Sequence, residues 1–336
     1  MRVLVKGAGV AGLTVAHELA AGGAEVTVVE RQYAIGDGAS WLAGGMLAPF
    51  CERENGEEAV IALGLLAAGW WEAALPRLVR FGGTLVVAPM RDLAEIRRFA
   101  VRTRGYSHLS ADEIGALEPD LGGRFRAGLF FEQEAHLDPR CALLRLQEKL
   151  VETGVCFLFG RTDAPPGERF DRIVDCTGVA AARSLPTLRG VRGEMLRLET
   201  RDVKLSRPVR LIHPRFPVYV VPRDEGCFMV GATMIESADD RPVTARSAME
   251  LLNAAYTLHP AFGEARVIEM AAGVRPAFAD NLPKVVEQDG IVFVNGFYRH
   301  GFLMAPALAR RVVELVLGKQ AGKGESNEAH RQRATA

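Results

Sequence analysis

A glycine-rich turn near the start of the chain constrains its fold more than any other feature. The run Gly7-Ala8-Gly9-Val10-Ala11-Gly12 follows a short β-type segment, Arg2–Lys6, and precedes an Ala- and Leu-rich helical segment, residues 13–20. Gly22 and Gly23 end that helix, and Glu25–Glu30 is a second predicted strand. A strand, a turn, a helix and a strand within about 30 residues predict a right-handed crossover between parallel strands.

Each part of this turn suits the binding of a diphosphate. Gly7 permits the tight turn, Gly9 removes a side chain so that backbone N–H groups can approach the ligand, and Gly12 lets helix and strand pack closely. The helix N-terminus offers unpaired N–H donors and a partial positive charge. Glu30, at the end of the second strand, can accept hydrogen bonds from ribose hydroxyls. We therefore predict a dinucleotide site here.

The segments after Glu30 favour FAD over NAD. An NAD domain needs two βαβαβ halves in tandem, and no second half follows the second strand. Residues 36–47 (GDGASWLAGGML) instead supply small residues that let the backbone pass a diphosphate and a flavin ring. Two later predicted strands end in glycine, at Gly178 and Gly296, and such strand ends lie at the edge of a parallel sheet where ligands bind.

The remaining segments predict two interleaved domains. The expected fold class is α/β: a Rossmann-like FAD-binding domain of the glutathione-reductase type, interleaved with an antiparallel-sheet α+β substrate domain. The FAD-binding domain is expected at 1–79, 138–190 and 270–318, the substrate domain at 80–137 and 191–269, and a polar tail at 319–336. Further predicted strands are 83–89, 170–175, 191–198, 218–222, 227–232 and 290–296, and further helices are 91–103, 110–117 with a capping box from Ser110 to Glu113, 141–153 and 305–317.

Composition excludes other classes of protein. The chain has 41 Lys plus Arg and 41 Asp plus Glu, and this zero net charge argues against a nucleic-acid binder. The cysteines are scattered without a C-x-x-C or a zinc-like spacing, which predicts no metal site and a reducing compartment. The longest apolar stretch, about 13 residues, is too short to cross a bilayer, and no signal-peptide pattern is present, so we expect a cytoplasmic protein.

Residues 295–306 (NGFYRHGFLMAP) predict a further part of the site. A strand ends, a loop with the cation Arg299 crosses, and a helix starts with Pro306 in its first turn, where proline fits. If this helix N-terminus points at the flavin, its dipole stabilises the negative charge of the reduced ring. His300 is more often, in such a loop, a histidine without a proton role.

Two upstream residues are candidates for holding a carboxylate. Arg275 stands before Pro276 in extended backbone, and Tyr219 alternates with Val221 on one face of a predicted strand. An arginine fork and a tyrosine hydroxyl both suit a carboxylate. In such contexts, however, an arginine is more often a surface ion pair and a tyrosine a half-buried core ring.

Seven motifs occur together in the order of a known family. The chain resembles the glycine oxidases of the thiamine pathway (ThiO type), within the D-amino-acid oxidase and sarcosine oxidase group, and the resemblance extends to about residue 318. Two departures are Lys6, where the family has an apolar residue, and a short segment after Phe159. The motifs are GxGxxG with its terminal Glu, GGML at 44–47, VRGEML at 191–196, YVVPR at 219–223, VGATM at 230–234, AGVRP at 272–276 and GFYRHGFLMAPA at 296–307.

The resemblance implies roles for individual residues. Arg275 would pair with the substrate carboxylate, Tyr219 would hydrogen-bond it, Arg299 would be a second cation, and Met234 would line a small pocket. No protein acid or base is implied. FAD would be non-covalent, because no cysteine follows Cys227 to form the link of sarcosine oxidases. The implied FAD contacts are Gly7, Gly9, Val10, Ala11, Gly12, Glu30, Arg31, Ala39, Ser40, Gly44, Gly45, Met46, Gly178, Tyr298, Arg299, His300, Gly301, Phe302 and Leu303.

The implied reaction is that of an FAD-dependent amino-acid oxidase. A hydride passes from the glycine Cα to flavin N5, the imine gives glyoxylate and ammonia or serves thiazole synthesis, and dioxygen reoxidises the flavin to give hydrogen peroxide. The family also suggests a homotetramer. The alternatives are a D-amino-acid or sarcosine-type oxidase, a dehydrogenase that uses a quinone, a non-catalytic flavin-binding module, and an NAD-dependent enzyme.

Overall fold

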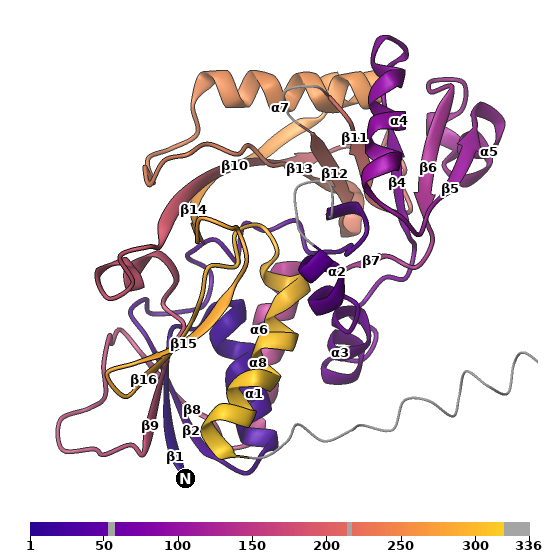
Figure 1. Ribbon diagram of the computed structural model, residues 1–336. Coiled ribbons are helices and arrows are strands. Elements are labelled where there is room, and N and C mark those ends of the chain that lie inside the picture. Colours follow the sequence, from indigo (N-terminus) through magenta and orange to yellow (C-terminus); the bar gives the residue numbers. More distant parts are fainter. Residues whose placement is uncertain (53–57, 214–216, 319–336) are drawn as a thin grey trace, which may run out of the picture.

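The computed structural model describes residues 1–52, 58–213 and 217–318. Two sheets with their helices form its two parts, which Figure 1 shows one above the other. The strands are β1 (Arg2–Lys6), β2 (Glu25–Glu30), β3 (Met46–Leu47), β4 (Thr84–Val87), β5 (Ser107–Ser110), β6 (Ala127–Phe131), β7 (Ala135–His136), β8 (Cys156–Phe159), β9 (Arg172–Asp175), β10 (Arg189–Glu199), β11 (Val209–Leu211), β12 (Val218–Pro222), β13 (Cys227–Gly231), β14 (Arg266–Ala277), β15 (Lys284–Gln288) and β16 (Ile291–Asn295). The helices are α1 (Val10–Ala21), α2 (Glu58–Gly64), α3 (Ala67–Ala74), α4 (Leu93–Arg102), α5 (Ala111–Leu117), α6 (Pro139–Glu152), α7 (Ala245–Leu258) and α8 (Gly301–Leu317).

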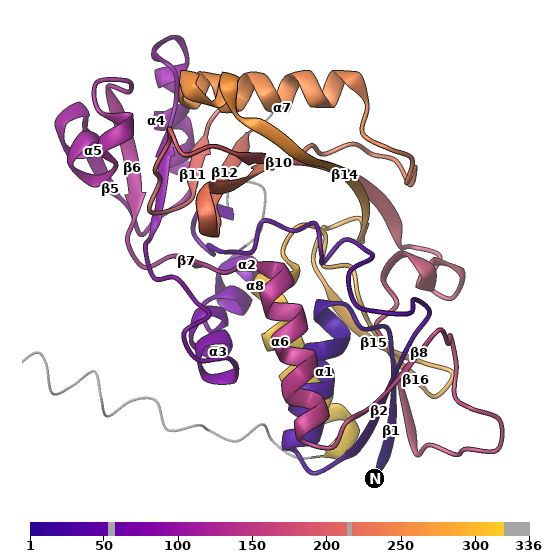
Figure 2. The ribbon, with the colours of Figure 1, turned by 180° about the vertical axis from the view of Figure 1, so that it is seen from behind.

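The first sheet is the predicted dinucleotide-binding sheet. Its strand order is β15-β16-β9-β1-β2-β8, and all neighbours are parallel except the β15–β16 hairpin. Apolar residues of β1 and β2, among them Val3, Val5 and Val28, pack with α1, α6 and α8 in one core. These three helices lie side by side on one face of the sheet (Figure 2). The parallel pairing of β1 and β2, joined by α1, confirms the predicted βαβ start.

The second sheet is mostly antiparallel, as expected for the substrate domain. Its order is β14-β10-β13-β12-β11-β4-β6-β5, with one parallel pair, β11–β4. Strand β12 alternates as predicted: Val218 and Val220 pack toward α7, while Tyr219 and Val221 share the opposite face with α4. That opposite face, which also carries Met195 and Met229, is the one that contributes to the site.

The chain passes repeatedly between the two parts. Strand β14 stays paired with β10 up to Ala277, so the expected boundary at residue 270 falls inside the eight-stranded sheet. The reason is the long β10–β14 pairing, which no local pattern reveals. The predicted polar tail, 319–336, lies outside the described residues.

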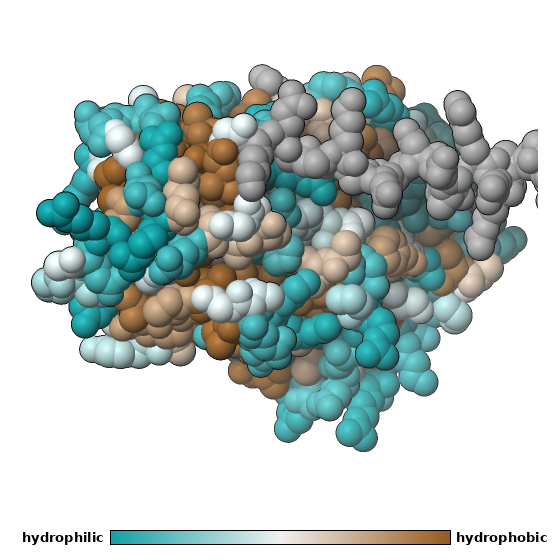
Figure 3. Space-filling model, turned by 90° about the horizontal axis from the view of Figure 1, so that it is seen from below, coloured by the Kyte–Doolittle hydropathy of each residue, from teal (hydrophilic) through white to brown (hydrophobic). Residues whose placement is uncertain are grey.

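Three local features complete the description. The capping box at α5 is present: the Ser110 hydroxyl accepts from the Glu113 N–H, and the Glu113 carboxylate accepts from the Ser110 N–H. Lys6 forms an ion pair with Asp163, 3.1 Å away in the short segment after β8, which accounts for its charge at the end of β1. Among the described residues, no helix is long and apolar enough to cross a membrane, and the face in Figure 3 is mainly polar with smaller apolar patches.

Candidate functional site

The glycine turn between β1 and α1 is fixed by close backbone packing. Gly7 has a φ of 95°, and a Cβ there would lie 2.8 Å from the Cys176 carbonyl oxygen. A Cβ on Gly12 would lie 1.8 Å from the Gly7 carbonyl oxygen, so helix and turn touch as the motif predicts. A Cβ on Gly9, by contrast, would have only the Ser40 hydroxyl within 4 Å, at 3.2 Å. Packing thus requires Gly7 and Gly12, whereas Gly9 keeps the helix N-terminus approachable.

The polar groups around this turn fit two adjacent parts of a dinucleotide. Glu30 accepts hydrogen bonds from the N–H groups of Ala8 (2.8 Å) and Gln32 (3.1 Å), which holds its carboxylate at the end of β2 beside the turn. The Ser40 hydroxyl accepts from the Val10 N–H at 3.1 Å, in the first turn of α1. A hydroxyl in place of a phosphate oxygen at a helix N-terminus indicates that this N–H can serve an anion. The residues present therefore fit the ribose and diphosphate of FAD.

Helix α8 begins earlier than the sequence suggested, and its start faces the same place. The helix starts at Gly301, so Pro306 lies inside it rather than in its first turn. Proline has no N–H for the carbonyl four residues back, but the Trp71 indole N–H donates to that Phe302 carbonyl at 2.9 Å. A Cβ on Gly301 would lie 3.1 Å from Val10 Cγ1. The N-termini of α1 and α8 therefore converge, and two helix dipoles act on one region.

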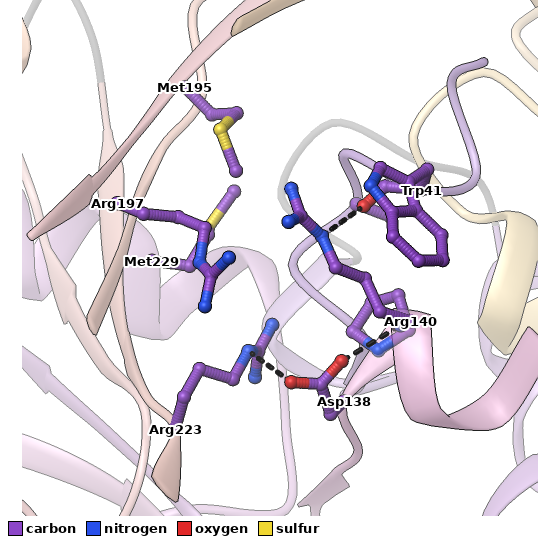
Figure 4. A pocket seen from close by; sticks show the side chains of 9 residues that line it. Trp41, Asp138, Arg140, Met195, Arg197, Arg223 and Met229 are labelled. Carbon is purple, nitrogen blue, oxygen red and sulfur yellow. Dashed lines mark hydrogen bonds and ion pairs between the residues drawn. The ribbon is translucent and has the colours of Figure 1, made fainter. Parts of the chain in front are cut away.

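Arginines hold the segment before β3 in place. Arg223 donates to the carbonyls of Gly44 (2.8 Å) and Leu137 (3.3 Å), and Arg140 donates to the Trp41 carbonyl (3.3 Å). Figure 4 shows the Arg223 guanidinium beside Asp138 and the Arg140 guanidinium beside Trp41, where they line an open pocket between this segment and the face of β10 and β13. Gly45 has a φ of 70°, and a Cβ there would lie 2.1 Å from the Leu137 carbonyl oxygen, so this position requires glycine.

Arg275 is seated on the face of the second sheet by a matched glycine. A Cβ on Gly193, on the neighbouring strand β10, would lie 2.0 to 2.4 Å from three guanidinium atoms of Arg275. The guanidinium donates to the Thr233 carbonyl at 3.1 Å, and no carboxylate of the described residues lies within 4 Å of it. Burial, and then the charge of Arg299, lower the pKa of Arg275 to about 10, so it stays cationic near neutral pH. This geometry suits a guanidinium that binds an anionic ligand.

The Tyr219 hydroxyl, predicted to hold a substrate carboxylate, has a carboxylate partner within the protein. Its O–H donates to the Glu52 carboxylate at 2.7 Å. Glu52 is buried and also lies 3.1 Å from Arg299 Nε and 3.4 Å from His300 Nδ1. Burial alone would raise the pKa of Glu52, but the charges of Arg299, His300 and Arg210 and the Tyr219 hydrogen bond lower it to about 2. Sequence reasoning missed Glu52, because no motif ties it to residues some 170 and 250 positions away.

The other predicted site residues lie around this cluster. Met234 is 39% exposed. Its Sδ lies 3.3 Å from both the Tyr298 hydroxyl and Arg299 Nη1. Tyr298 has a φ of 52° in the loop before α8. Burial lowers the pKa of His300 to about 4, so it is neutral at pH 7.

The remaining predicted FAD contacts are more scattered. Ala39 lies 3.7 Å from a Cβ built on Gly273, and Asn295 Nδ2 donates to the Gly178 carbonyl at 2.9 Å. Arg31 is exposed at the end of β2, and Leu303 packs against Gly64 of α2. Ala11 is buried in α1, and Met46 pairs with His136 between β3 and β7.

Fold and site together define a two-part flavoprotein, with a dinucleotide-binding sheet and a second sheet that presents cations to one ligand region. The family described as FAD dependent oxidoreductase (DAO) matches residues 2–315, and the chain belongs to it. The protein is accordingly an FAD-dependent oxidoreductase.

Comparisons with individual proteins agree with this class. The chain is 60% identical over 320 residues to a Rhizobium etli protein whose name describes it as a thiamine biosynthesis oxidoreductase, ThiO, with 95% of this chain and 98% of that protein covered. It is 28% identical to the glycine oxidase of Pseudomonas aeruginosa over 95% of each chain. The crystal structure of glycine oxidase from Geobacillus kaustophilus has the same fold, with a TM-score of 0.82, 24% identity and 96% of each chain covered.

Proposed function

We propose that this protein is a glycine oxidase that converts glycine, water and dioxygen into glyoxylate, ammonia and hydrogen peroxide. The observation that carries the proposal is the Arg275 guanidinium, which is seated over Gly193 and has no carboxylate of the described residues within 4 Å. A planar fork of this kind binds a carboxylate in two parallel hydrogen bonds. The names of the relatives in Rhizobium etli and Pseudomonas aeruginosa support glycine as substrate and a place in thiamine biosynthesis.

The residues of the chain supply position rather than acid–base chemistry. FAD, when bound, accepts the hydride from the substrate Cα and passes the electrons to dioxygen. Arg275 fixes the substrate carboxylate and thereby the direction of the Cα–H bond. Beside Arg299, the Tyr298 hydroxyl lies 3.3 Å from Met234 Sδ, so a thioether and a phenol border this part of the site. Holding reactants at near-attack distance can be worth about 7–11 kcal/mol, so positioning alone can account for much of the rate.

FAD is expected to lie between the two helix N-termini and the arginine-held segment. The predicted contacts at the turn, Glu30, Ser40, residues 44–46 and residues 298–303 surround this region. The Tyr219 hydroxyl proton is committed to Glu52, so we propose that Tyr219 contributes through its oxygen and its ring rather than as a free donor to the carboxylate. A cytoplasmic location and a homotetramer stay predictions.

The test is an anaerobic titration of the purified yellow protein, with flavin bleaching as the signal. Glycine should bleach the flavin at lower concentration than sarcosine, D-alanine or D-proline, and glyoxylate and ammonia should appear in equal amounts. Admission of air should restore the colour and yield hydrogen peroxide. Bleaching by sarcosine or a D-amino acid in preference to glycine would instead assign the related oxidase activity. Bleaching that only a quinone reverses would indicate a dehydrogenase, and no bleaching at all a binding module.

A further inference from the structure

Glu52 is a buried carboxylate with ligand-facing residues on two sides. It is 6% exposed and accepts the Tyr219 hydroxyl proton at 2.7 Å. On its other side, Arg299 directs both Nε, at 3.1 Å, and Nη2, at 3.3 Å, to the same carboxylate. The third nitrogen of Arg299, Nη1, lies 3.3 Å from Met234 Sδ. All three guanidinium nitrogens of Arg299 therefore have a partner within the protein.

The two arginines of the site thus differ in what they offer a ligand. Arg275 donates to a neutral carbonyl, that of Thr233, and its charge meets no carboxylate of the described residues within 4 Å. Arg299 is already paired in a charge-assisted, two-nitrogen contact with Glu52. A ligand carboxylate can take Arg275 without competition, whereas it must displace Glu52 to take Arg299.

Two further groups lie beside this cluster. Arg210 Nη1 lies 3.4 Å from the Tyr219 hydroxyl, and His300 Nδ1 lies 3.4 Å from Glu52 without a hydrogen-bond partner among the described residues. Glu52 cannot easily turn away, because Tyr219 of the second sheet and Arg299 of the loop before α8 donate hydrogen bonds to its carboxylate. Moving an anion so enclosed would leave several donors unpaired, at about 1–3 kcal/mol for each buried group.

We propose that Glu52 is a specificity-determining residue that limits the site to substrates with a single carboxylate. By keeping Arg299 paired, it excludes amino acids and amines that bear a second anionic group beside the one held by Arg275. The proposal rests on the proposed function for the identity of the first carboxylate. In Glu52→Gln, an uncharged group of nearly the same size would leave Arg299 without its counter-ion, and the site would then accept a second carboxylate.

The first measurement is binding, because it does not depend on turnover. Acetate and malonate differ by one carboxylate, and their binding to the FAD-loaded protein can be followed through the visible flavin spectrum. We expect Glu52→Gln to improve malonate affinity relative to acetate at least tenfold. An unchanged ratio in a variant that retains FAD overturns the proposal.

The second measurement repeats the comparison in turnover. Sarcosine and iminodiacetate share the N-methylene-carboxylate unit and differ by one carboxylate. Glu52→Gln should raise the ratio of their kcat/KM values, iminodiacetate over sarcosine, at least tenfold. If neither the wild type nor the variant oxidises any of these compounds while the malonate ratio still shifts, the proposed function fails and the role of Glu52 stands.

The matched control is Glu134→Gln. Glu134 is equally buried and close by, where it accepts the Cys51 N–H at 2.7 Å. Burial raises the pKa of Glu134 to about 8, so near pH 7 it is mostly uncharged and glutamine resembles it closely. Both ratios should stay at the wild-type value in this variant. An equal shift in both variants would show a general effect of altered packing and would contradict the proposal.

Two more variants test whether Glu52 acts through Arg299. Adding Arg299→Gln to Glu52→Gln should abolish the gain in malonate affinity, and persistence of the gain would contradict the mechanism. Should Glu52→Gln fail to fold, Arg299→Gln alone decides the matter. It leaves the Glu52 charge unbalanced, so malonate binding should weaken at least tenfold relative to acetate, and an unchanged ratio would overturn the proposal.

Discussion

Gly193→Ala should weaken substrate binding and leave the fold intact. A Cβ at this position would lie 2.0 Å from Arg275 Nη2, 2.2 Å from Cζ and 2.4 Å from Nη1. The backbone of Gly193 is ordinary strand with a negative φ, so alanine is not strained there. Because the obstructed atoms are the far end of a flexible side chain, the guanidinium moves and the strand does not.

The size of the effect follows from the distances. Ordinary contact begins near 3.4 Å, so the guanidinium must shift by about 1.4 Å. A misplacement of about 1 Å can cost about 100-fold in a positioned reaction. Loss of charge-assisted hydrogen bonds to the carboxylate, at about 1.5–3 kcal/mol each, gives a similar figure. We therefore expect kcat/KM for glycine to fall about 100-fold, mainly through KM.

The assay is steady-state oxygen consumption, with FAD content and thermal unfolding measured on the same preparation. The matched control is Gly190→Ala on the same strand, where a Cβ would lie 2.8 Å from Val274 and 3.0 Å from the Ala238 backbone. That variant should lose stability and keep its KM. A Gly193→Ala enzyme with wild-type KM would refute the placement of Arg275 at the substrate.

Three more predictions test other parts of the structure. Gly12→Ala should prevent FAD binding, since its Cβ would lie 1.8 Å from the Gly7 carbonyl oxygen; flavin absorbance of the purified protein checks this. Trp71→Phe leaves the Phe302 carbonyl unpaired and should cost about 1–3 kcal/mol in urea unfolding, more than Trp70→Phe at a less buried indole. Burial, Arg223 and Arg80 lower the pKa of His136 to about 3, so the folded state binds fewer protons between about pH 3 and 6.5, and stability falls on acidification. His136→Phe should flatten that slope by up to about 1.4 kcal/mol per pH unit, and an unchanged slope would rule out His136 as its source.

The sequence predicted those parts of the fold that depend on local chemistry. The turn from Gly7 to Gly12, the strand ending at Glu30 and the capping box at Ser110 all follow from neighbouring residues, and the structure confirms them. It did not predict the start of α8, because the Trp71 indole, more than 200 positions away, supplies the hydrogen bond that Pro306 cannot make. The extent of β14 was missed for the same reason, since pairing with β10 sets it.

The residues of the site likewise fall into those that the local sequence predicts and those that depend on distant segments. Arg275, Tyr219 and Arg299 could be chosen from residue type and motif, and the structure brings them into one cluster with Met234. Glu52 could not be chosen, because a lone glutamate after an apolar segment usually faces solvent. Its burial as an anion depends on Arg210 and Arg299, from two distant segments, and its presence decides where the Tyr219 proton and the Arg299 charge are directed.

The most direct test of the central claim is the KM of Arg275 variants for glycine, with bound FAD measured in parallel. Arg275→Ala should retain FAD and raise KM by at least about 100-fold, because the substrate carboxylate loses its bidentate partner. The KM of Arg275→Lys should lie between those of the wild type and Arg275→Ala, since the point charge of lysine replaces the two-pronged guanidinium. An Arg275→Ala protein that keeps its FAD and its wild-type KM for glycine would contradict the account.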